Sequence, residues 1–208
     1  MRFSSYDWSE KDMIGGNAAI DFINTASKWS SGDAVDHLGG PDGFGQWAGA
    51  AGLLHGDDLA RLKREMTADP KGAQEVFETA VALRTALWSI LSAIITGGEV
   101  DDRDLALLDE SKVRAAGHCR IKKENGGFRR ACADEAPALE RALRLIVEAA
   151  EDLLLNGRLD RLHACGGEAC EWVFLDTSKN GRRRWCDMAT CGNDAKVKKF
   201  RGRSKSAA

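Results

Sequence analysis

Two pairs of cysteines near the C-terminal end constrain this sequence more than any other feature. Cys165 and Cys170 form the first pair and Cys186 and Cys191 the second, each with four residues between its members; fifteen residues separate the pairs. Such a pair can turn so that both sulfurs point to one place, and the spacer lets the second pair fold back onto the first. Four thiolates complete the tetrahedral coordination of Zn²⁺, so the pattern predicts one structural zinc ion.

The four cysteines have two alternative interpretations besides zinc. Two disulfides would need an oxidising compartment, and residues 1–16 contain no basic segment followed by an apolar one, as a signal peptide would. An iron–sulfur cluster also takes four thiolates, but paired cysteines with four residues between them are not its usual spacing. His163, two residues before the first cysteine, is interpreted as a strand residue rather than a substitute ligand.

The charge of the chain is divided unevenly around these cysteines. Residues 179–208 contain ten Lys and Arg against two Asp, a net charge of +8, whereas residues 1–178 contain 20 Lys and Arg against 30 Asp and Glu, a net charge of −10. A basic end joined to an acidic body indicates a polyanionic partner for that end. The alternative is a basic tail that is only solvated, but the charges alternate with Trp185, Val197 and Phe200.

The sequence around the second pair predicts how the basic side chains are presented. Residues 172–175 are predicted to form a strand, Asn180-Gly181 a hairpin turn after it, and residues 195–203 a helix capped by the segment Gly192–Asp194. Val197 and Phe200 are expected to pack back on the metal site. Six residues are expected to contact DNA phosphates or guanine edges: Arg182, Arg183, Arg184, Lys196, Lys199 and Arg203.

These segments resemble a known family. The runs from Cys165 to Asp176, from Asn180 to Met188 and from Cys191 to Lys196 are similar to the CGNR zinc finger, although Asp194 stands where the signature has arginine. We expect Asp194 to cap the helix instead. The opening run from Gly15 to Thr25 resembles the start of the ABATE domain. The resemblance implies a bacterial transcription regulator that binds DNA through the finger and senses a stress-derived ligand through its N-terminal domain.

The remaining sequence predicts a helical body in front of the finger. Apolar periodicity and capping signals predict helices over 44–51, 58–66, 73–96, 102–114 and 137–155, with 18–24 either a short strand or the start of a helix. A hairpin is predicted over 118–124 and 127–133. The expected fold class is α+β: a mainly helical N-terminal domain with a small β-hairpin over 1–157, and a treble-clef-like zinc finger over 158–208, packed close to the body because the link is short.

One charged residue interrupts the apolar stripe of the longest predicted helix. Arg84 lies between Val81 and Trp88, and a guanidinium on an apolar face needs an acceptor because it does not lose its proton. Its first interpretation is a salt bridge to Asp21 or another carboxylate of the body. The second is a pocket in which Arg84, with Asn24 and Trp88 as neighbours, binds an anionic or carbonyl-bearing ligand.

The predicted hairpin contains the other two cysteines. If Asn125-Gly126 forms a two-residue turn, counting outward places Cys119 directly opposite Cys132. Two free thiols are expected in a reducing cytosol, and a redox switch is the alternative hypothesis.

The function expected from the sequence is that of a one-component transcription regulator. We expect it to bind double-stranded DNA and a small ligand and to be located in the cytoplasm. A homodimer is possible, because a single finger buries little DNA surface. No apolar run is long enough to predict a membrane span. An enzyme is not expected, since no Ser/His/Asp or Cys/His set is recognisable. The alternative function is a zinc-organised module that binds protein or RNA without reading DNA.

Overall fold

The computed structural model describes residues 2–3, 6–29, 34–117, 119–132, 136–167 and 170–198 of the 208-residue chain. The predicted sites Lys199, Phe200 and Arg203 lie outside these residues. Helices dominate, and the strands form small separate sheets, so the predicted α+β class is confirmed. The principal helices and strands are β1 Arg2–Phe3, α1 Ala18–Ile23, β2 Ala26–Ser27, β3 Val35–Asp36, α2 Pro41–Ala50, α3 Asp57–Ala68, α4 Pro70–Thr96, α5 Asp102–Gly117, β4 Cys119–Glu124, β5 Gly127–Cys132, α6 Ala138–Asn156, β6 Leu162–Ala164 and β7 Val173–Leu175.

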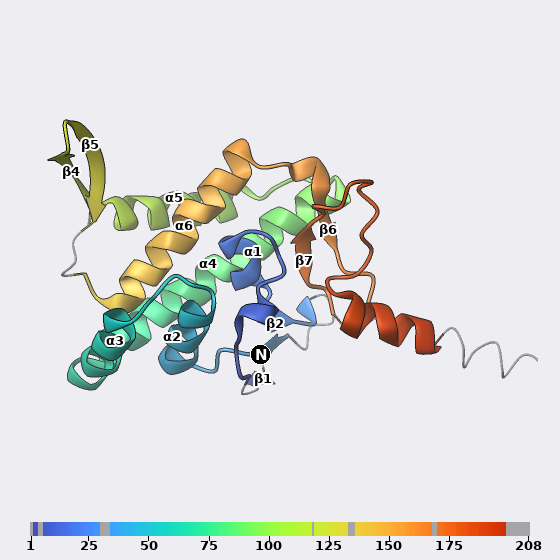
Figure 1. Cartoon of the computed structure of the whole chain (residues 1–208), viewed down its shortest axis with the longest axis horizontal. Coiled ribbons are helices and arrows are strands. Elements are labelled where there is room, and N and C mark those ends of the chain that lie inside the picture. The colour runs from blue at the N-terminus through green and yellow to red at the C-terminus, as the bar shows by residue number, and fades with distance from the viewer. Residues whose placement is uncertain are drawn as a thin grey trace, which may run out of the picture.

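Helices α4 and α6 form the centre of the body, with α1, α2, α3 and α5 packed around them (Figure 1). α4 begins at Pro70 behind its cap Asp69 and ends at Gly97, whose φ of 69° is the left-handed value at which glycine terminates helices. α4 is also long and apolar enough to cross a membrane by composition alone. Here it is a core helix, because residues such as Ala80, Leu83 and Ile90 are buried against the rest of the body.

The first helix resolves the ambiguity of residues 18–24. Asn17 lies in extended conformation, and its side chain accepts a hydrogen bond from the backbone N–H of Ala19 at 2.8 Å, which starts a helix rather than a strand. α1 is buried on nearly every residue. The three-stranded sheet of β1, β3 and β2 beside it was not predicted, since each strand has only two residues.

The β4–β5 hairpin has the predicted register. Asn125 (φ 48°) and Gly126 (φ 81°) form its turn, and Cys119 pairs with Cys132 across the strands. Cys119 is disulfide-bonded, so the expectation of a free thiol at this position is wrong. Whether the bond acts as a redox switch stays a prediction.

The strands of the finger pair differently from the prediction. β7 pairs antiparallel with β6, which precedes the first cysteine pair, so Cys165 and Cys170 lie in the loop of this hairpin. The predicted hairpin after residue 175 is wrong: Gly181 (φ 61°) turns the chain there, but no strand follows it among the described residues up to 198. His163 lies in β6, as predicted.

Candidate zinc centre and basic surface

The four cysteines of the finger converge on one point. The sulfurs of Cys165, Cys170, Cys186 and Cys191 all lie within 4.8 Å of one another. The sulfur of Cys186 is 3.5 Å from that of Cys170 and 3.6 Å from that of Cys191. Four ligands at about 2.3 Å from a tetrahedral zinc would be roughly 3.8 Å apart, so the donor set fits Zn²⁺ and leaves no open position on it.

The loop between β6 and β7 places the first two sulfurs. The backbone N–H of Cys165 donates to Trp172 O at 2.7 Å, and that of Cys170 donates to Gly167 O at 3.2 Å, which closes a tight turn. Gly167 suits this turn because a Cβ there would lie only 3.2 Å from the Cys191 sulfur and from Cys170 Cβ, a tighter contact than side chains usually make. The loop therefore folds around the space that the metal would fill.

The other two sulfurs come from the start of the C-terminal helix. A π-helical turn over Met188–Gly192 continues as an α-helix over 193–198, and Cys191 lies inside that first turn. The Asp187 carboxylate caps it by accepting from Thr190 N at 3.0 Å. The helix thus begins seven residues before the predicted position 195, and its cap is Asp187. Asp194, the predicted cap, is an exposed helical residue.

The electrostatics of the sulfur cluster favour a bound cation. Hydrogen bonds from the thiols of Cys170 and Cys186, together with the backbone N–H groups of Cys186 and Gly167, lower the pKa of Cys165 to about 2. The same proximity to Cys165 raises the pKa of Cys170 to about 12 and also raises the pKa of Cys186. Four thiolates therefore repel one another unless a positive ion lies between them, which is what zinc supplies.

The predicted DNA-contacting residues divide into two groups. Arg182, Arg184 and Lys196 are exposed, as a phosphate-binding surface requires. Arg183 is different, because its guanidinium donates to Trp185 O at 3.0 Å, Ile14 O at 3.3 Å and Cys186 O, and stacks 4.2 Å from the Phe174 ring centroid. These contacts tie the metal loop to the body and leave Arg183 less exposed than its neighbours; its DNA contact stays a prediction. Val197, predicted to pack on the metal site, is instead 39% exposed.

The finger is joined to the body by backbone and side-chain hydrogen bonds. The amide of buried Asn24 donates to Val173 O at 2.9 Å and accepts from Val173 N at 2.8 Å, and Leu175 N donates to Gly15 O at 2.9 Å. Leu162 and Val173 belong to the main core of the body. The expectation that the finger packs close to the body is confirmed. Sequence reasoning missed this role of Asn24, since nothing in the sequence pairs residue 24 with residue 173.

Arg84 is fully buried and pairs with Asp36 and Thr25. Its guanidinium forms a salt bridge with Asp36 and donates to the Thr25 hydroxyl at 2.7 Å. The salt-bridge interpretation is therefore confirmed, but not with Asp21. Burial raises the pKa of Asp21 to about 6, although its carboxylate accepts from Gly15 N at 2.7 Å.

The three residues of the predicted ligand site have partners within the protein. Trp88 stacks on Trp29 with ring centroids 5.1 Å apart, Asn24 binds Val173, and Arg84 binds Asp36. The ligand-binding role of Asn24, Arg84 and Trp88 stays a prediction.

Comparison with protein families agrees with this architecture. A family model described as ABATE, "Putative stress-induced transcription regulator", matches residues 16–157, and the CGNR zinc finger model matches residues 161–204. The chain therefore belongs to the ABATE family and carries a C-terminal CGNR zinc finger. The family assignment and the converging cysteines together support one structural zinc ion as its cofactor. A comparison with curated proteins found no match.

Proposed function

We propose that this protein is a cytoplasmic, non-enzymatic transcription regulator that binds double-stranded DNA through its zinc finger. The observation that carries the proposal is the exposure of Arg182, Arg184 and Lys196 on a segment fixed by the metal site. Cations held on a rigid scaffold can contact successive phosphates without a further ordering cost, and arginine also reads guanine in the major groove. Lys199 and Arg203 extend the proposed surface by sequence.

The connection between body and finger supports a regulatory role for the body. Asn24 binds Val173 in the finger, and its neighbour Thr25 accepts the hydrogen bond of Arg84 in the central helix α4. A ligand that changed the packing around Arg84 and Trp88 would thus act on a residue adjacent to the finger's attachment point. We infer that the body senses a small molecule and changes the position or the stability of the finger.

Substitution of the two exposed arginines tests DNA binding. The Arg182→Ala, Arg184→Ala double variant should bind mixed-sequence duplex DNA about tenfold more weakly or worse. The slope of log K plotted against log[salt] should also become less steep by about 1 to 2. Arg158→Ala is the matched control, because Arg158 is paired with Asp160 at 2.7 Å outside the finger surface. Equal affinity and equal salt slope for the double variant would contradict the proposed surface.

A thermal-shift panel of small organic acids and carbonyl compounds tests sensing. A ligand that raises the melting temperature of the wild type should have a weaker effect on Trp88→Ala, and its presence should change DNA affinity in the wild type. A ligand whose effect is unchanged by Trp88→Ala would place the sensing site elsewhere.

A further inference from the structure

The β4–β5 hairpin carries apolar side chains that its own chain leaves uncovered. It stands away from the helices at one end of the molecule, opposite the end that carries the C-terminal helix (Figure 1). Ile121 is 79% exposed and Phe128 is 78% exposed, the two most exposed of the large apolar side chains that the structure describes. Exposed aromatic and branched side chains that lie together are unusual on a monomer and mark interaction sites.

Both side chains lie on the same face of the hairpin. Ile121 pairs with Arg130 and Lys123 pairs with Phe128, so Ile121 and Phe128 are diagonal neighbours on the face that also holds Cys119. The disulfide bond at Cys119 lies at the base of the hairpin. The pair is thus presented on a short two-stranded arm.

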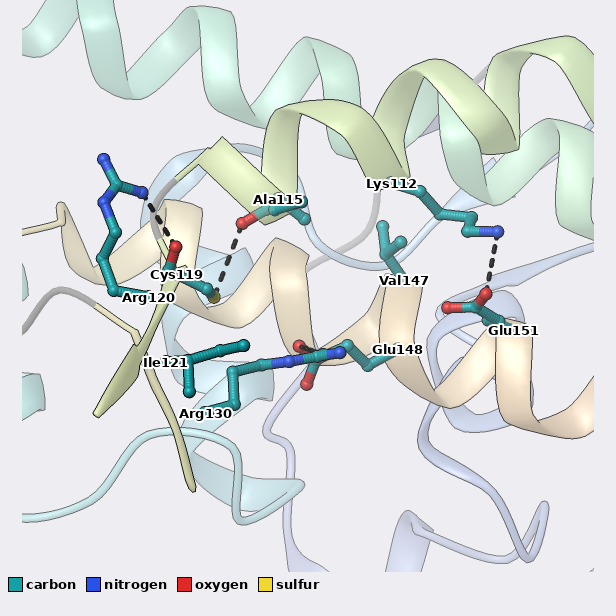
Figure 2. A pocket seen from close by; sticks show the side chains of 10 residues that line it. Lys112, Ala115, Cys119, Arg120, Ile121, Arg130, Val147, Glu148 and Glu151 are labelled. Atoms are coloured by element: carbon teal, nitrogen blue, oxygen red, sulfur yellow. Dashed lines mark hydrogen bonds and ion pairs between the residues drawn. The ribbon is translucent and has the colours of Figure 1, made fainter. Parts of the chain in front are cut away.

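A cavity lies between this face of the hairpin and helices α5 and α6. Its volume is about 290 Å³, and Ala115, Ala116, Ile121 and Val147 supply its apolar lining. Figure 2 shows two ion pairs at its edge: Lys112 binds Glu151 at 2.8 Å and Arg130 binds Glu148 at 3.0 Å. The pocket is open to solvent, and charged side chains share its lining with the apolar ones; its volume exceeds the roughly 150 Å³ that binds benzene, so an aromatic side chain fits it by size. The chain's own Phe128 is not part of the lining.

The charges favour a second copy of this chain over DNA as the occupant. Hairpin residues 119–132 carry five Lys and Arg and one Glu, a net charge of +4, but Arg129 and Arg130 are already paired with Glu124 and Glu148. The rest of residues 1–178 carries 15 Lys and Arg against 29 Asp and Glu, a net charge of −14. Lys123, on the same face as Ile121 and Phe128, therefore complements the acidic body of another copy, while Phe128 and Ile121 have no counterpart in a phosphate backbone.

We propose that this surface, the hairpin face with Ile121 and Phe128 together with the adjoining cavity, is the interface of a symmetric homodimer. Each copy provides one arm and one cavity, so Phe128 of each copy enters the cavity of the other, as two-fold symmetry requires. The fingers then project from the ends distant from the interface and reach two separate DNA half-sites. This inference specifies the homodimer expected for the proposed function; dimerisation itself is measured without DNA, so its failure is distinguishable from a failure of DNA binding.

The test is the mass of the zinc-loaded full-length protein by sedimentation velocity from about 1 to 100 µM. The wild type should dimerise and remain dimeric in 0.5 M NaCl, because burial of apolar side chains is not screened by salt. Phe128→Ser should raise the dissociation constant of the dimer about a hundredfold or more, because the substitution removes one buried phenylalanine from each of the two copies. Ile121→Ser should act in the same direction. Met188→Ser is the matched control, because Met188 is 54% exposed but lies in the finger.

Each outcome bears on one proposal only. A wild type that stays monomeric at 100 µM, or a Phe128→Ser variant that dimerises as well as the control, would overturn the interface and leave DNA binding by the finger unaffected. Unchanged mass for Phe128→Ser together with weaker DNA binding by a Lys122→Gln, Lys123→Gln variant would instead identify the hairpin as a nucleic-acid arm. Circular dichroism of each variant verifies that its helices are intact.

Discussion

The helical body buries its apolar side chains in one continuous core, whereas the described part of the finger has a small cluster of its own, in which Phe174, Cys165 and Cys186 are buried and Trp172 and Trp185 partly buried. The body can therefore fold on hydrophobic burial. The finger needs two other sources of stability, the metal ion and its attachment through β7 to residues 14–24 of the body. The comparison shows how the finger, although too small to fold by itself, can hold a basic surface rigidly: the metal ion and the attachment to the body fix it in place.

The largest effect should follow removal of one metal ligand. Cys186→Ser leaves three thiolates, so zinc content should fall well below one ion per chain, and DNA binding should be lost, because structural zinc contributes on the order of 10 kcal/mol to folding of such modules. The helical circular dichroism of the body should remain nearly unchanged. Unfolding of the whole chain would contradict the distinction between the two regions.

Breaking the buried ion pair should be the largest single effect on the body. Arg84→Ala leaves the carboxylate of Asp36 buried without its cation, and the free energy of unfolding should fall by about 3–5 kcal/mol in urea titrations. The matched double variant, Arg84→Met with Asp36→Leu, should lose less because no charge stays buried. A loss below about 1 kcal/mol in Arg84→Ala would mean that the pair is not essential to the core.

Asn24→Ala should loosen the attachment while leaving both regions folded. It leaves the buried N–H and C=O of Val173 without their partner, which costs about 2–4 kcal/mol. Hydrogen exchange at the Val173 amide should accelerate, and a protease should cut more readily between body and finger. Asn156→Ala, which removes only an exposed hydrogen bond to Asp152, is the control. Equal exchange rates in the two variants would show that Asn24 does not hold the finger.

The smallest predicted effect is a pH dependence from Asp21 near the attachment. Burial raises the pKa of Asp21 from 3.8 to about 6, so the folded state binds a proton more tightly than the unfolded chain does. Stability should therefore fall as the pH rises from about 4 to 6, by about 2–3 kcal/mol from this group. Asp21→Asn should remove that decrease. Urea midpoints of both proteins at pH 4 and 7.5 measure it, and parallel curves would contradict it.

The cysteine spacing and the capping residues made much of this architecture predictable. Local signals such as Pro70, Gly97 and the Asn125-Gly126 turn gave the long helix and the hairpin with its register. The sulfur cluster followed from spacing alone, because chelating pairs encode their own geometry.

Pairings between distant segments could not be predicted in the same way. Arg84 forms its salt bridge with Asp36 rather than with Asp21, and Asn24 hydrogen-bonds to Val173. Both pairings depend on how the helices pack, which local sequence signals do not give. The triple arginine looked uniform in sequence, but Arg183 faces inward while its neighbours are exposed. The helix start at Met188, with Asp187 as its cap, was missed because the π-helical turn holds Cys191 inside the helix rather than before it.

The most direct test of the account is fluorescence anisotropy of the full-length protein on mixed-sequence duplex DNA across a salt series, before and after the metal is removed with a chelator. The account predicts binding that weakens steeply with salt and is lost on chelation, then restored by added zinc. Absence of binding at low salt with zinc bound, or equal binding after zinc removal, would contradict a zinc-organised DNA-binding surface.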